Sequence, residues 1–137
     1  GEAMADMLAA DYRKACSFKR FVFQPMSRAG ALRRELSRRG WPILEERLIA
    51  ENGRLFVALS AGPGNLPYRL TPLETDVGPL LLRRETAYRS RYLKSCLHRY
   101  REAFCGLMQA GGDRDMAVNE YRDKIRELEA ILDDSPG

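Results

Sequence analysis

The sequence has few of the residues that build metal sites, disulfide frameworks or membrane spans. Its 137 residues include one histidine, His98, and three cysteines that form no CxxC pair, Cys16, Cys96 and Cys105. A zinc site and a disulfide framework are therefore disfavoured, and no metal ligand is assigned. No apolar run approaches the roughly 20 residues that cross a bilayer, and no signal-peptide pattern is present. We therefore predict a cytoplasmic protein with no membrane partner.

Arginine, in contrast, is abundant and unevenly distributed. Residues 1–101 hold 19 Lys and Arg against 10 Asp and Glu, and 16 of these 19 cations are arginines, whereas residues 102–137 hold 4 cations against 9 anions. Arginine binds phosphate oxygens through paired donors, so this excess favours a phosphate-bearing partner such as nucleic acid. A solvated basic surface without any partner is the alternative.

The first 62 residues predict a mixture of helices and strands. Apolar spacing indicates a short helix over 2–14, and the apolar run of 19–24 indicates a strand. A helix follows, with Ser27 as its N-cap, Ala31, Leu32 and Leu36 on one face, and Gly40 at its end. Residues 43–51 and 54–61 flank Asn52-Gly53, the pair favoured in a type I′ turn, and are predicted to form an antiparallel hairpin.

The second half predicts a linker and then two helices. Residues 62–79 are rich in Pro and Gly, so we expect an extended segment and a domain boundary there. From about residue 84 the pattern is helical on both sides of Gly111-Gly112, with Asp113 as the second N-cap. The two apolar stripes should pack into one antiparallel helical hairpin. The seam residues are Leu93, Leu97, Tyr100, Phe104 and Leu107 in the first helix and Val118, Tyr121, Ile125, Leu128 and Leu132 in the second.

The ordered series of segments resembles a known family. "GEAMADMLAA", "KRFVFQP", "LRRELSRRGWPILEERLIAENGRLFVALSAGPG" and "GPLLLRRE" follow one another ahead of the two helices. Over essentially the whole chain, this series resembles the bacterial tRNA adenine-N1 methyltransferases that modify adenine 22. The resemblance implies an α/β fold, namely the C-terminal half of a Rossmann-like methyltransferase sheet followed by an all-α antiparallel coiled-coil helical hairpin. In that sheet the last strand runs antiparallel and inserts next to the fifth, which is the strand predicted over 19–24.

The resemblance also implies which residues lie near the reaction. Gln24 and Pro25, at the end of the fifth strand, are the candidate catalytic positions, and Gly1 and Glu2 are the candidates near S-adenosylmethionine. Gln24 would hydrogen-bond the target adenine, or Gln24-Pro25 would simply end the strand. Met26 stands where the family has Asn. The family's cofactor loop and ribose-binding acid are not in this sequence, so the resemblance implies a chain that is inactive alone and binds no cofactor tightly.

The helix over 28–39 and the first helix of the predicted hairpin both carry many cations. Together they are the predicted tRNA-binding surface, because clustered cations bind backbone phosphates. Tyr88 and Tyr92 lie among these cations and would either stack on an exposed base or pack on the helical seam. The candidate RNA-binding residues are Arg28, Arg33, Arg34, Arg83, Arg84, Arg89, Arg91, Lys94, Arg99 and Arg101.

The predicted organisation is therefore a partial Rossmann-like methyltransferase domain over 1–62, a linker over 63–83 and an RNA-contacting helical hairpin over 84–137. In the intact protein, the resemblance implies S-adenosylmethionine-dependent methylation of N1 of an adenine in tRNA. The alternative is a stand-alone, non-enzymatic module that binds nucleic acid or dimerises through exposed sheet edges.

Overall fold

The computed structural model describes residues 19–24, 26, 28–112 and 114–134. The predicted helix over 2–14 and the predicted N-caps Ser27 and Asp113 lie outside these residues. The chain divides into two compact units, Gly1–Ala87 and Tyr88–Gly137, and each is described by itself. No helix in the described part of the chain is long and apolar enough to cross a membrane.

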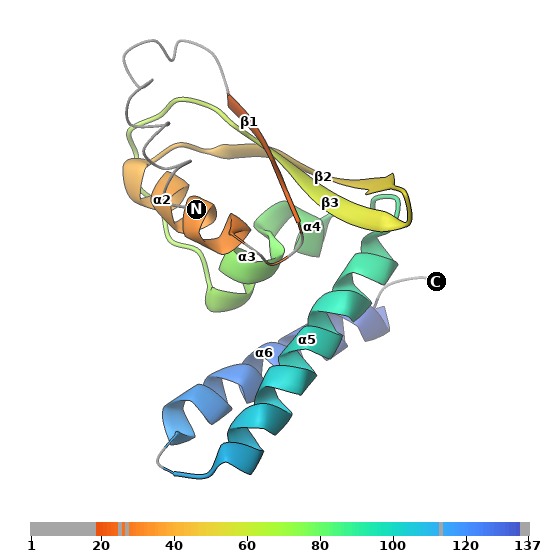
Figure 1. The fold of residues 1–137 in the computed structure, drawn as a ribbon. Helices are drawn as coiled ribbons and strands as arrows, with labels where there is room; N and C mark the ends of the chain where they lie inside the picture. The colour runs from red at the N-terminus through yellow and green to blue at the C-terminus, as the bar shows by residue number, and fades with distance from the viewer. Residues whose placement is uncertain (1–18, 25, 27, 113, 135–137) are drawn as a thin grey trace. The chain divides into compact units, whose positions relative to one another are not determined.

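The first unit contains a three-stranded antiparallel sheet (Figure 1). Its strands are β1 (Lys19–Phe23), β2 (Ile43–Glu51) and β3 (Arg54–Ala61), in the spatial order β1-β3-β2. Asn52 and Gly53 have φ angles of 52° and 77°, as a type I′ turn requires. The structure therefore confirms the hairpin, and it confirms that the last strand pairs antiparallel with the first.

One face of this sheet packs against the helix α2 (Ala29–Arg39). Alternation along β1 directs Phe21 and Phe23 into the core, whereas Val22 on the opposite face is 51% exposed. The core cluster consists of Phe21, Phe23, Ala29, Leu32, Leu36, Trp41, Leu59 and Ala61. Within the described residues β1 pairs only with β3, so its other edge has no strand partner there. Among the described residues, α2 packs on the face that carries Phe21 and Phe23, while Val22 on the other face is exposed.

Gly40 ends α2, as predicted, and a larger residue would not fit there. Its φ of 77° lies in the left-handed region, and its N–H reaches the carbonyls of Leu36 and Ser37. A Cβ at this position would lie 2.3 Å from the backbone nitrogen of Leu66. The N-cap is Arg28, whose side chain makes no capping hydrogen bond.

The segment 63–83, predicted to be a linker, instead contains two short helices within the first unit. These are α3 (Pro72–Val77) and α4 (Pro79–Arg83). Thr71 and Glu74 form a capping box at the start of α3. Both helices begin with proline, which is favoured at the first helical position because its missing N–H has no partner there anyway. The same prolines that suggested a linker therefore start helices.

Tyr68 attaches the first part of this segment to α2 and to the residues between α2 and β2. Its hydroxyl donates to the Trp41 carbonyl at 2.7 Å, and its N–H donates to the Ser37 carbonyl at 3.1 Å. Burial raises the pKa of Tyr68 to about 12, and the nearby Glu46 carboxylate adds to the shift. Residues 62–70 are therefore held against the rest of the first unit by hydrogen bonds, although they form no helix or strand.

The second unit is a pair of antiparallel helices, α5 (Arg89–Ala110) and α6 (Asp115–Asp134). Tyr100 packs edge-on against Tyr121. Lys124 Nζ lies over both rings, 5.4 Å from the centroid of Tyr100 and 5.3 Å from that of Tyr121. Of the ten predicted seam residues, Leu93, Leu97, Tyr100 and Leu128 are buried, and the others are half-buried. The first helix begins at Arg89 rather than near residue 84, after a turn at 87–88.

Candidate nucleic-acid interface

The outer face of α5 carries the main group of exposed cations. Arg91, Lys94, Arg99 and Arg101 are all exposed, and no acidic residue lies in the first turn of the helix. Arg91 and Lys94 are three residues apart and so share one side of the helix, whereas Arg99 lies on a different side. Exposed cations of this kind can contact the repeated charges of a nucleic-acid backbone.

Two contacts with carboxylates involve side chains on this face, and the one made by Arg101 is an ion pair. Arg101 pairs with Glu129 of α6 at 2.8 Å, and His98 Nε2 lies 3.1 Å from Glu102 on the same helix. All four side chains are exposed, so these contacts hold the groups weakly. His98 lies on the surface as a single histidine, and no group of three or more metal-binding side chains occurs in the described part of the chain.

Two of the residues predicted around this helix are buried. Arg89 is 5% exposed and Tyr92 is fully buried. The prediction that Arg89 binds RNA from the surface is therefore wrong for the structure as described, and Tyr92 packs rather than stacks on a base. The two residues are three apart and lie on the inner side of the helix. Tyr88, in contrast, is 49% exposed.

On α2, the predicted cations also separate into exposed and buried residues. Arg28 and Arg34 are exposed. Arg33 is fully buried, where its Nε donates to Glu46 Oε2 at 2.8 Å and its Nη1 donates to the carbonyls of Thr75 and Asp76. The assignment of Arg33 to the RNA-binding surface is therefore wrong, because a buried guanidinium held in this way cannot reach an external phosphate.

The remaining arginines near the C-terminus of α2 are held by an acidic neighbour. Glu35 pairs with both Arg38 and Arg39, and hydrogen bonds from these two guanidinium groups hold the pKa of the Glu35 carboxyl below its usual value. The outer side of α2 thus offers Arg28 and Arg34 as its less restrained cations.

Arg83 and Arg84, at the end of α4, are both exposed. Arg83 donates to Glu74 Oε2 at 2.6 Å, which ties it to α3. Arg84 is the C-cap residue and has an extended backbone. Both residues remain candidates for phosphate contacts, and Arg84 is the less restrained of the two.

Of the two predicted catalytic residues, Gln24 and Pro25, the structure describes Gln24. Gln24 follows β1 and is exposed, and Met26 beyond it has a φ of 58°. Pro25, Gly1 and Glu2 lie outside the described residues. Cofactors of Rossmann-like proteins bind where neighbouring parallel strands diverge, and every strand pair of the described sheet is antiparallel. The described sheet thus contains no parallel strand pair of the kind at which such a cofactor binds.

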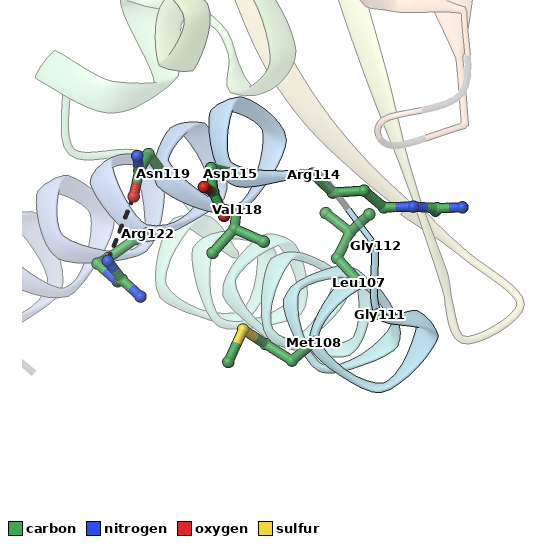
Figure 2. A pocket seen from close by; sticks show the side chains of 9 residues that line it. All are labelled: Leu107, Met108, Gly111, Gly112, Arg114, Asp115, Val118, Asn119 and Arg122. Atoms are coloured by element: carbon green, nitrogen blue, oxygen red, sulfur yellow. Dashed lines mark hydrogen bonds between the residues drawn. The ribbon is translucent and has the colours of Figure 1, made fainter.

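A pocket at the turn between α5 and α6 was not predicted from the sequence (Figure 2). It has a volume of about 330 Å³. In the wall of the pocket, Arg122 Nη1 donates to Asn119 Oδ1 at 3.3 Å, and the Arg122 guanidinium lies over the Phe104 ring. The Gly-Gly break indicated a turn but gave no sign of a hollow beside it. The lining residues are Leu107, Met108, Gly111, Gly112, Arg114, Asp115, Val118, Asn119 and Arg122.

The fold is similar to that of several solved structures, and part of the chain matches a methyltransferase family model. A family model described as "Methyltransferase domain" matches residues 1–59. The structure of the B. subtilis m1A22 tRNA methyltransferase TrmK is similar, with a TM-score of 0.70 at 20% identity, over 94% of this chain and 58% of that one. No curated protein sequence matches the chain.

Two further structures have the same arrangement. A protein from Listeria monocytogenes serotype 4b is similar with a TM-score of 0.71 at 19% identity, covering 96% of this chain and 57% of that one. M. capricolum TrmK in complex with S-adenosyl-homocysteine has a TM-score of 0.63 at 14% identity, covering 96% and 55%. The chain thus spans somewhat more than half the length of these proteins. At these identities the likeness shows a shared fold.

Proposed function

We propose that this chain is the C-terminal part of an S-adenosylmethionine-dependent tRNA methyltransferase that methylates N1 of an adenine in tRNA. In this proposal β1, β2 and β3 form the end of the catalytic sheet, and the basic helix α5, in the helical arm that it forms with α6, binds tRNA. The intact protein contains further strands, which supply the cofactor site.

The observation that carries this proposal is the match of both units to methyltransferase structures. The similarity covers at least 94% of the chain, so it includes the helical pair as well as the sheet. Two of the three similar structures are named as TrmK, and one is described as an m1A22 tRNA methyltransferase. Many functions share a Rossmann-like sheet, but the sheet combined with this appended helical pair is a more specific arrangement.

The charge of α5 agrees with this role, because the helix carries five cations and one acidic residue, Glu102, whereas α6 is acidic. Exposed arginines and a lysine on α5 would contact tRNA phosphates, and Arg28, Arg34 and Arg84 would provide further phosphate contacts on the first unit. The revised set omits Arg33 and Arg89, which are buried. We also propose that α5 and α6 pack as a coiled coil, since their apolar residues repeat at alternating spacings of three and four.

The chemistry requires that the target edge of the base be free. S-adenosylmethionine, when bound, supplies the methyl group. N1 of adenine lies on the pairing edge, so the base must leave its pairing before it can react. Gln24 is exposed just after β1 and is the described residue that we place nearest this edge. Its amide is suited to hydrogen-bond an adenine.

A non-enzymatic module that dimerises is the competing function. It is favoured by one observation, namely that β1 has a strand partner on one side only within the described residues. A bare strand edge is a template for pairing with another chain. In the enzyme proposal the same edge of β1 pairs with the upstream strands of the intact protein. That protein would act in the cytoplasm.

The two functions are separated by a methylation assay on the full-length protein. A tRNA transcript with adenine at position 22 is incubated with S-adenosylmethionine, and 1-methyladenosine is quantified by mass spectrometry after digestion. We expect product with this transcript and none when uridine replaces adenine 22. Absence of product from both transcripts, with a protein that self-associates, would support the dimerisation module instead.

A further inference from the structure

Tyr88 has a backbone conformation that bulky residues rarely adopt. It precedes α5 with φ 67° and ψ 4°, in the left-handed region. This conformation brings Cβ close to the backbone and is normally taken by Gly, Asn or Asp. Of the other described non-glycine residues, only Met26 and Asn52 have positive φ, and Asn52 occupies a turn that favours asparagine. A tyrosine at this position is therefore unfavourable for local folding.

The side chain of Tyr88 does not compensate for this backbone conformation. It makes no capping hydrogen bond to α5, and it has no hydrogen bond, ion pair or ring contact within the described part of the chain. Its ring is 49% exposed. The other exposed large hydrophobic side chains of the described residues belong to Val, Leu and Met, so Tyr88 is the single aromatic among them. Strained, exposed residues of this kind occur preferentially where a ligand binds.

The surroundings of Tyr88 favour a nucleic-acid ligand. Arg91 lies three residues further along and Lys94 six, both exposed on the same helix. The first turn of α5 contains no acidic residue. An exposed aromatic ring beside a row of cations provides both groups that single-stranded nucleic acid requires, a stacking surface for a base and positive charge for the backbone.

We propose that Tyr88 is a base-stacking residue, whose ring receives one unpaired nucleobase of the RNA that contacts Arg91 and Lys94 through its phosphates. The occupant is an unpaired base because a base within a duplex already stacks on its neighbours. This inference rests on the proposed function and adds to it a specific contact at the start of the helical arm.

The test uses the full-length protein and an unmodified tRNA transcript with adenine at position 22. Dissociation constants are measured by fluorescence anisotropy at several salt concentrations for the wild type, Tyr88→Asn, Tyr88→Phe and a control, Met116→Asn. Met116 is exposed on α6. Melting temperatures are recorded for every variant, because asparagine tolerates the left-handed conformation and should not lower the stability.

We expect Tyr88→Asn to weaken binding about 5- to 150-fold, the range typical when one stacking interaction is removed. Its melting temperature should equal or exceed that of the wild type. Tyr88→Phe, which keeps the ring, and Met116→Asn should bind as the wild type does. The dependence of affinity on salt should be unchanged in Tyr88→Asn, since stacking releases no counterions.

Each other result overturns a distinct claim. If Tyr88→Asn binds tRNA as tightly as the wild type, the stacking role is wrong while the proposed function stands. The stacking role also fails if Tyr88→Phe loses as much affinity as Tyr88→Asn, or if the loss follows a lowered melting temperature. If the wild-type protein itself does not bind the transcript, the proposed function fails and this inference fails with it.

Discussion

Arg33 and Glu46 form a buried ion pair that joins several elements of the first unit. Both side chains are fully buried, and Glu46 accepts hydrogen bonds from Arg33 Nε and from the Leu80 N–H, each at 2.8 Å. Arg33 in turn holds the last carbonyls of α3. Gly78 passes so close that a Cβ there would lie 2.7 Å from the Glu46 carboxylate. The pair therefore fixes the corner between α3 and α4 against β2 and α2.

Removal of one partner of this pair should strongly destabilise the protein. Glu46→Ala leaves the Arg33 guanidinium buried without its counter-charge and the Leu80 N–H without its acceptor. We expect a loss of about 3–5 kcal/mol in the free energy of unfolding, the range typical of a broken buried pair. Urea denaturation of the full-length protein measures this change.

Glu45→Ala is the matched control for that experiment. Glu45 neighbours Glu46 in β2 but pairs with Arg47 near the surface. Exposed pairs contribute at most about 1 kcal/mol, so the urea midpoint of Glu45→Ala should stay close to that of the wild type. Equal losses of unfolding free energy in the two variants would show that burial of the Arg33–Glu46 pair does not increase its contribution to stability.

The buried Arg33–Glu46 pair could not be predicted from the sequence. In the sequence Arg33 resembles its exposed neighbours, and its partner lies 13 residues away on another element.

At the scale of elements, regular patterns were predictable and irregular ones were not. The β2–β3 hairpin follows from two apolar runs around Asn52-Gly53, and the α5–α6 pair follows from the spacing of its apolar residues. The prediction for segment 63–83 failed because its prolines were interpreted as interruptions. Pro72 and Pro79 instead occupy first helical positions. Which role a proline takes depends on the surface available to the next helix, and that is a property of the folded unit.

Helix α5 should bind tRNA through its exposed cations rather than through its buried arginine. In the full-length protein, Arg91→Ala with Lys94→Ala should weaken tRNA binding at low salt. The slope of log affinity against log salt concentration should fall by about 1 for each phosphate that the variant no longer neutralises. Anisotropy titrations at a series of salt concentrations give both quantities.

Arg126→Ala is the control for charge alone. Arg126 is exposed on α6, beside the acidic residues Glu127 and Asp123. We expect its affinity and salt slope to match those of the wild type. A similar decrease in slope for all three cations would indicate a diffuse attraction to net positive charge, with no surface specific to α5.

At the scale of the whole molecule, the described sheet lacks the parallel strands on which a Rossmann-like cofactor crevice depends. The crevice of a Rossmann-like sheet forms at the carboxyl ends of parallel strands, at the point where the strand order reverses. The described order β1-β3-β2 contains only antiparallel pairs and no such point. The similar structures extend well beyond the length that this chain spans. Sequence resemblance indicated this division, because the segments it matched all belong to the family's second half.

Residues 1–137 by themselves should therefore bind S-adenosylmethionine weakly or not at all, whereas the full-length protein should bind it. Isothermal titration calorimetry on both proteins measures the difference. Circular dichroism of the shorter protein should show the helical signal of α5 and α6, because a lack of binding is informative only for a folded chain. Micromolar binding by folded residues 1–137 would mean that a cofactor site forms without any parallel strand pair in the described sheet. The assignment of β1, β2 and β3 to the end of a methyltransferase sheet would then be wrong.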